Sequence, residues 1–173
     1  MRLRGGVRPG GPGLERAIVV RILFVTFPWA THHFPMVPLE WACRAAGHDV
    51  RVASTAALHD VIVQSGLPAI SVGQDSELAK IAADRRLLTL QSKRWPDDWP
   101  IHPERLDSEQ VELAAALGRM QIAIAAVMLD DLLSFARAWR PDLVVHDAVS
   151  FAGPVVAAAL GVPNVSHLWG SPG

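Results

Sequence analysis

The sequence of 173 residues contains a single cysteine, Cys43. One cysteine cannot form a disulfide within the chain, so a disulfide-stabilised scaffold is excluded and a reducing, cytoplasmic setting is indicated. Cys43 stands beside Trp41 and Ala42 in a segment of helical character. We expect a buried thiol that packs as a small hydrophobic side chain rather than a nucleophile.

The sequence also lacks an uninterrupted apolar run of about 18 residues, the length that a membrane-spanning helix needs. Its most hydrophobic stretch, 17–27, is interrupted by Arg21, so no membrane span is expected. Charge of one sign is not in excess either, since 16 Lys and Arg side chains oppose 17 Asp and Glu side chains. Without a strong field to attract nucleic acid or an anionic membrane, the composition favours a small-molecule or protein partner.

Residues 1–19 form a segment rich in Arg and Gly that lacks the compact apolar region of a secretory signal. We expect a disordered extension or a mis-annotated start, with Val20 as a natural first residue. The run Gly10-Gly11-Pro12-Gly13 does not predict a phosphate-binding loop, because no strand precedes it and Pro12 lacks a backbone donor.

From residue 20 onward, short apolar runs alternate with helical segments, which is the pattern of a parallel α/β sheet. The runs 21–27, 49–53, 67–72, 142–146 and 164–168 predict strands. Helices are expected at 35–46, 55–64 and 150–160, and in two pieces within 108–139 because Gly118 weakens the middle. The segment 92–103, with its prolines and two tryptophans, is expected to be a loop. The fold class is therefore α/β, a Rossmann-like parallel sheet with flanking helices.

Titratable side chains follow two of the expected strands. His32 and His33 come after the first strand, and His146 and Asp147 come at the end of the fourth. Ligands of open parallel sheets bind outside the carboxyl ends of the strands, so these side chains are candidates for one site. An imidazole oriented by a carboxylate can act as a general base near neutral pH. A simpler alternative is that Asp147 caps the helix expected from Ser150.

Several motifs resemble actinobacterial natural-product glycosyltransferases of family 1, and most closely the macrolide deoxysugar and aminosugar transferases. They are THHFPMVPL at 31–39, AAGHDV at 45–50, WRPDLV at 139–144 and HLWGSP at 167–172. A sugar-nucleotide epimerase of the same two-domain fold fits less well, because the first and last of these motifs follow the transferase pattern.

The resemblance implies a GT-B fold, with residues 20–173 as its acceptor-binding N-terminal domain, incomplete, and with the C-terminal nucleotide-sugar domain absent. It implies inverting transfer of a deoxysugar or other hexose from a TDP- or UDP-sugar to a hydroxyl of a hydrophobic acceptor, such as a polyketide. The position of the family's catalytic histidine matches His32 and that of its acidic partner matches Asp147. No metal or other cofactor is expected, whereas a P450-like activator protein is a potential partner.

We expect five further residues to contact substrate, namely His33, Phe34, Trp95, Trp99 and His146. Structural roles stay open for most of them, since His33 could face solvent, His146 could fill a strand end, and the two tryptophans could anchor their own loop. An alternative function is also open: a catalytically inactive α/β module that binds an acceptor or a partner protein. Because the chain stops directly after an expected strand, we further expect an unfinished sheet and marginal stability.

Overall fold

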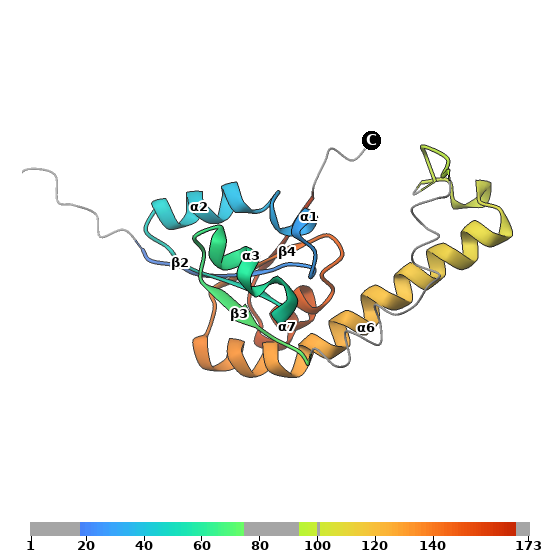
Figure 1. Ribbon diagram of the computed structural model, residues 1–173. Coiled ribbons are helices and arrows are strands. Elements are labelled where there is room, and N and C mark those ends of the chain that lie inside the picture. The colour runs from blue at the N-terminus through green and yellow to red at the C-terminus, as the bar shows by residue number, and fades with distance from the viewer. Residues whose placement is uncertain (1–17, 75–93, 100, 169–173) are drawn as a thin grey trace, which may run out of the picture.

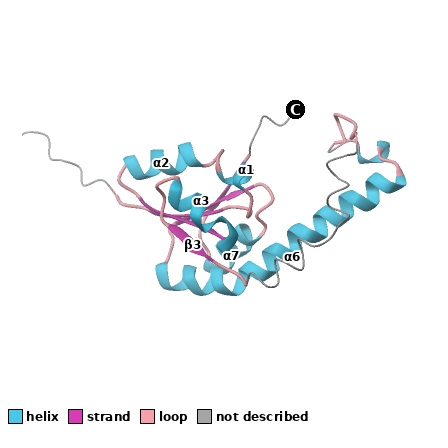
Figure 2. Cartoon of the chain, viewed as in Figure 1, coloured by secondary structure: helices cyan, strands magenta, loops and turns pink. Residues whose placement is uncertain are grey.

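A computed structural model of the chain describes residues 18–74, 94–99 and 101–168. Its five strands are all parallel and form one sheet in the order β3-β2-β1-β4-β5. The strands are β1 (Arg21–Val25), β2 (Asp49–Ser54), β3 (Ala69–Ser71), β4 (Leu143–Asp147) and β5 (Asn164–His167). The expected Rossmann-like parallel sheet is confirmed (Figure 2). The expected extension lies mostly outside the described residues.

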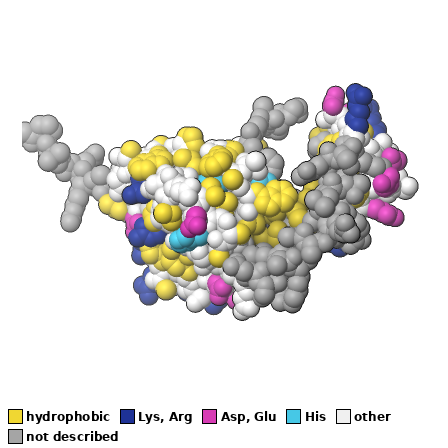
Figure 3. Space-filling model, in the orientation of Figure 1, with side chains coloured by type: hydrophobic (Ala, Val, Ile, Leu, Met, Phe, Trp, Pro, Cys, Tyr) yellow, Lys and Arg dark blue, Asp and Glu magenta, His cyan; other side chains and the backbone are white. Residues whose placement is uncertain are grey.

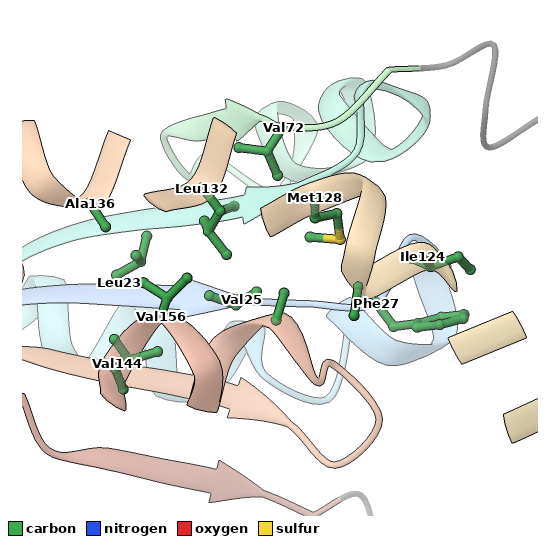
Figure 4. Close-up of a cluster of buried hydrophobic side chains, with 14 of the residues drawn as sticks. Leu23, Val25, Phe27, Val72, Ile124, Met128, Leu132, Ala136, Val144 and Val156 are labelled. Carbon is green, nitrogen blue, oxygen red and sulfur yellow. The ribbon is translucent and has the colours of Figure 1, made fainter. Parts of the chain in front are cut away.

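Helices cover both faces of the sheet (Figure 1). On one face lie α2 (Val37–Ala45) and α3 (His59–Gln64), and on the other lie α6 (Ser108–Trp139) and α7 (Ala152–Leu160). Alternate residues of β1 enter the two cores: Phe24 packs toward α2 and α3, whereas Leu23 and Val25 pack toward α6 and α7 (Figure 4). Burial on both sides explains why β1 reads as one continuous apolar run.

Two segments near the sheet differ from the expected elements. The expected loop at 28–33 contains a short helix, α1 (Ala30–His33). The expected helix at 55–64 is divided into a 3-10 turn, Ala56–Leu58, and α3, and the Thr55 side chain makes no capping hydrogen bond. Helical turns as short as these are held by tertiary packing rather than by intrinsic propensity, so local sequence patterns predict them poorly.

Helix α6 is one continuous helix of 32 residues, so its expected division at Gly118 is wrong. A glycine inside a helix costs only about 1 kcal/mol relative to alanine, which a long and otherwise favourable helix tolerates. Asp107 and Gln110 close its N-terminus as a capping box, in which each side chain accepts a hydrogen bond from the other residue's backbone N–H. The C-terminal part of α6 packs on the sheet, and its N-terminal part projects away from it (Figure 1).

Among the described residues, α6 is also the one helix long and apolar enough to cross a membrane, judged by length and composition alone. Its hydrophobicity is an average over apolar and polar residues, so the sequence contains no uninterrupted apolar run at this helix. Met128, Leu132 and Ala136 of this helix lie in the core beneath the sheet. A single helix that packs in a protein core is weak evidence for a membrane span.

Candidate functional site

The carboxyl ends of β1 and β4 lie side by side, because the two strands pair in parallel with Val25 opposite His146. The segment after β1 leads into α1, and the segment after β4 leads into α7. This topology brings His32 and Asp147 together, with 3.5 Å between His32 Nδ1 and Asp147 Oδ1. The expected proximity of these two residues is therefore found.

Asp147 is a fully buried carboxylate held by several donors. It accepts hydrogen bonds from the backbone N–H of Phe27, from that of Val149 at 2.9 Å, and from the Ser150 hydroxyl at 2.9 Å. Burial by itself would raise the pKa of Asp147, but hydrogen bonds from His32 and from these three groups outweigh it and lower the pKa below its usual value. The carboxylate is consequently ionised at neutral pH.

The alternative role of Asp147, as the cap of the following helix, is not what the structure shows. Helix α7 begins at Ala152, and its N-terminus has no side-chain capping hydrogen bond. Asp147 instead orders the turn between β4 and α7 and, at the same time, the start of the segment after β1 through Phe27. One carboxylate thus ties together the two segments that form the site.

Aromatic rings surround the imidazole of His32. Its ring centroid lies 4.9 Å from that of Phe27 and 5.8 Å from that of Trp29. Phe27 and Trp29 also meet edge to face at 5.1 Å. The His32 side chain keeps 12% of its surface exposed, so part of the ring is accessible. Because Nδ1 faces Asp147, Nε2 lies on the opposite side of the ring.

A shallow apolar hollow adjoins this pair. It encloses about 170 Å³ of empty space, some of it open to solvent. The lining comes from Phe27, from α6 and from the turn into α7: Gln121, Ile124, Ala125, Met128, Val149, Ser150, Phe151 and Ala152. This space is shared with open solvent and leaves no enclosed room for a ligand, so the hollow is a surface depression and not a binding pocket.

Exposed aromatic side chains lie beside α1 and at the hollow. Trp29, Phe34 and Phe151 are between 39% and 56% exposed and follow or flank α1 and β4. On the face drawn in Figure 3, hydrophobic side chains are common over α1 and α2. A large apolar ligand is the kind of molecule that such a surface favours.

His33 does not face solvent, so the structural alternative left open for it is not what the structure shows. Its side chain is fully buried, with Nε2 3.3 Å from Ser65 Oγ and Nδ1 3.8 Å from Glu40 Oε2. Consecutive residues of a helix point about 100° apart, which explains why His32 faces Asp147 and His33 faces α2 and α3. The burial of His33 leaves no surface for the substrate contact expected of it.

His146 is also buried, and its contacts are internal. Its Nδ1 lies 3.0 Å from the Asp147 carbonyl oxygen, and its Nε2 lies 3.3 Å from Asn164 Oδ1. Its Cβ lies beneath α7, where a Cβ added at Gly153 would come within 2.6 Å of it. These contacts fit the structural alternative, in which His146 fills the end of β4.

Trp95 and Trp99 pack on each other, with ring centroids 5.1 Å apart. They belong to the segment that precedes α6 and lies at its projecting end, away from the sheet (Figure 1). The structure does not bring this segment to His32. Phe34, by contrast, is 56% exposed directly after α1, so its expected role as a substrate contact stays a prediction.

The sequence did not identify Phe27, Trp29, Ile124, Met128 or Ser150 as neighbours of the site. Trp29 could have been predicted near the site, because it stands in the same short segment as His32. Ile124 and Met128 could not, since they come from a helix about 90 residues further along the chain. Among the described residues, no three His, Cys, Asp or Glu side chains gather as metal ligands would.

The chain is similar in sequence to known proteins of one family. Residues 41–172 match the family described as erythromycin biosynthesis protein CIII-like, N-terminal domain. The chain belongs to this family. It is 34% identical over 172 residues to tylactone mycaminosyltransferase of Streptomyces fradiae, a match that covers 94% of this chain and 37% of that enzyme. It is 37% identical over 162 residues to 10-deoxymethynolide desosaminyltransferase of Streptomyces venezuelae, covering 87% of this chain and 36% of the relative.

Solved structures agree with the family assignment. The chain superposes on glycosyltransferase VinC, crystallised with dTDP, with a TM-score of 0.66 and 38% identity, covering 88% of this chain and 35% of VinC. The described fold is that of the N-terminal half of a GT-B glycosyltransferase. This member of the CIII-like family spans a little over a third of the length of these relatives.

Proposed function

We propose that this chain is the acceptor-binding half of a cytoplasmic glycosyltransferase that transfers a deoxysugar or other hexose to a hydroxyl of a hydrophobic natural product. The observation that carries the proposal is the pair formed by His32 and Asp147 at the carboxyl edge of the sheet. Membership of the CIII-like family and similarity to mycaminosyl and desosaminyl transferases support the reaction class.

In the proposed reaction, Nε2 of His32 takes the proton of the acceptor hydroxyl while the hydroxyl oxygen attacks the anomeric carbon of the donor sugar. The new bond joins that oxygen to carbon, and the bond from carbon to the nucleotide diphosphate breaks on the opposite face, which inverts the configuration. Asp147 accepts from Nδ1–H and stabilises the imidazolium. The separation of 3.5 Å is long for a hydrogen bond, and catalytic contacts of this kind commonly tighten when substrates bind.

The acceptor we propose is a polyketide or another aglycone of low polarity. The support is the apolar surface of the exposed Trp29 and Phe151 rings, together with the shallow depression beside Phe27. As these described residues form only one wall, the remainder of an acceptor site must come from other parts of the enzyme. The donor we propose is a TDP- or UDP-sugar held by a second domain, and the dTDP complex of VinC supports the thymidine nucleotide.

The test joins this chain to the C-terminal part of tylactone mycaminosyltransferase and measures sugar transfer by mass spectrometry. TDP-sugars serve as donors and macrolactones as acceptors, with a P450-like activator protein co-expressed because such a partner belongs to the proposal. We expect the joined enzyme to transfer sugar and the 173-residue chain alone to transfer none.

Within that enzyme, His32→Ala should lower kcat by about 10²–10⁴-fold, the usual contribution of a general base. His59→Ala is the matched control, because His59 is at the start of α3 and bonds to Ser71 of β3, outside the site. Wild-type turnover in His32→Ala would refute the base assignment. Acceptor binding without transfer, with donor and activator present, would favour the non-catalytic module instead.

A further inference from the structure

A buried polar cluster lies behind the short helix that carries His32. Glu40 of α2 and His33 of α1 are both fully buried, and 3.8 Å separates Glu40 Oε2 from His33 Nδ1. Neither carboxyl oxygen of Glu40 has a hydrogen-bond partner, and neither does His33 Nδ1. Buried polar atoms nearly always find partners, so three unpartnered atoms side by side call for an explanation.

Protonation of the carboxyl supplies that explanation. Burial raises the pKa of Glu40 to about 8, and burial lowers the pKa of His33. Both groups are therefore neutral near pH 7, and the Glu40 O–H becomes a donor for which Nδ1 of His33 is the adjacent acceptor. A shift of roughly 1 Å would close the gap to a normal hydrogen-bond length.

The hydrogen bonds in the rest of the cluster are compatible with a Glu40 O–H that donates to His33. If Nδ1 of His33 accepts, its Nε2 carries the hydrogen and can donate to Ser65 Oγ at 3.3 Å. Ser65 Oγ in turn donates to the Val61 carbonyl at 2.9 Å. The donors then run in one direction from α2 through α1 to α3, which leaves no conflict between two hydrogens.

We propose that Glu40 is a positioning residue for His32: with His33 and Ser65 it forms a buried clamp that holds α1 against α2 and α3. The clamp itself follows from the contacts just described, whereas its effect on turnover rests on the proposed role of His32. Helix α1 has four residues and no side-chain cap. A helix so short is unstable alone, so side-chain contacts on both of its sides must fix its position.

In the part of the chain that the structure describes, the ionisable groups close to the Glu40 carboxyl come from α1 and α2. From α1, His33 faces the Glu40 carboxyl; from α2 itself, Cys43 lies close enough that burial and the Glu40 charge raise the pKa of its thiol. From α3, the nearby group is the hydroxyl of Ser65, which does not titrate near neutral pH. A change in ionisation of Glu40 therefore acts first on His33.

The experiment records histidine side-chain NMR spectra of the 173-residue chain and of three variants. Glu40→Gln keeps a donor for Nδ1 at every pH, Glu40→Leu removes it, and Cys43→Ala is the control, since Cys43 is on the same helix but outside the clamp. We expect His33 to be the neutral Nε2–H tautomer in the wild type and in Glu40→Gln. In Glu40→Leu, the resonances of both His33 and His32 should shift, although Glu40 does not touch His32.

Two results would overturn the clamp: an Nδ1–H tautomer of His33 in the folded wild type at pH 6.5, or unchanged His32 resonances in a folded Glu40→Leu variant. Should Glu40→Leu not fold, the pH titration decides. In the wild type the His32 and His33 signals should move together as pH passes about 8, and in Glu40→Gln they should not. Equal movement in both proteins would contradict the proposal.

Turnover in the joined enzyme separately tests whether the clamp positions His32 for catalysis. Because misplacement by about 1 Å can cost about 10²-fold, we expect Glu40→Leu to lower kcat by about 10–100-fold with little change in KM, and Glu40→Gln to restore it. A folded Glu40→Leu enzyme with normal kcat would show that the clamp does not position the base. If His32→Ala is fully active while the NMR results hold, the clamp stands and the base assignment fails.

Discussion

The buried carboxyl of Glu40 makes folding stability depend on pH in an unusual direction. In the folded chain the pKa of Glu40 is raised from 4.5 to about 8, so the folded state keeps a proton that the unfolded state releases. Stability from this group is complete below pH 4.5 and is lost as pH rises through about 8. Most carboxylates act in the opposite sense, because pairing lowers their pKa.

Among the described residues, Glu40 is the shifted group that dominates between pH 6.5 and 8. The lowered pKa of His33 affects stability mainly below its ordinary value of 6.5, and that of Asp147 mainly below 3.8. The raised pKa of Cys43 acts above 9.0. The free energy of unfolding should fall with a slope that approaches about 1.4 kcal/mol per pH unit and is halved near pH 8, where half of Glu40 has ionised. Proton release from unfolded His33 just above pH 6.5 offsets part of this fall, so the net loss from pH 6.5 to 8 should be about 1–1.5 kcal/mol.

Urea unfolding followed by circular dichroism at half-unit steps from pH 6.5 to 8 measures this slope. With an m-value of about 1–3 kcal/mol/M, the wild-type midpoint should fall by roughly 0.3–1.5 M. Glu40→Gln cannot ionise, and its midpoint should stay nearly constant. A flat wild-type profile, or the same slope in both proteins, would show that Glu40 is ionised in the folded chain and would refute the reasoning.

Two further predictions concern stability. Asp147→Asn should lower the free energy of unfolding by about 1–3 kcal/mol at pH 7, because its amide group would confront N–H donors. The deficit should shrink as pH falls below 3.8 toward the lowered pKa of the wild-type carboxyl, and a deficit that stays constant down the acid range would argue against an ionised Asp147. Gly153→Ala should lower the free energy of unfolding by about 1–3 kcal/mol, because the new Cβ would lie 2.6 Å from His146 Cβ. Gly118→Ala, in open space within α6, should raise it by about 0.5–1 kcal/mol. Changes of the opposite sign in urea unfolding would contradict the packing described.

Much of the sheet was predictable because a strand covered on both faces must be apolar throughout. The run containing Leu23, Phe24 and Val25 shows this, since successive side chains enter different cores. Gly47, with φ of 90°, marked the end of α2 for an equally local reason. The continuity of α6 was not predictable from Gly118, because the cost of one glycine is small beside the packing of the remaining helix.

The site was predictable where strand order alone decides it. His32 and Asp147 follow adjacent parallel strands, so topology brings them to one edge. The burial of His33 was not predictable, because it depends on a helical turn that exists only through contacts with α2 and α3. Trp95 and Trp99 illustrate a second limit, since composition shows an aromatic loop but not the direction in which a long helix carries it.

The two adjacent histidines of α1 face different parts of the protein for one geometric reason. Neighbouring positions on a helix differ by about 100°, so when one imidazole faces β4, the next must face away from it. A four-residue helix contributes almost no stability of its own, and its orientation is set by whatever these two side chains contact. His32 meets an ionised carboxylate and His33 faces a protonated one. The two imidazoles therefore lie in different surroundings: His32 beside an anion that can orient it for the proposed proton transfer, and His33 beside a neutral acid that can hold it in place.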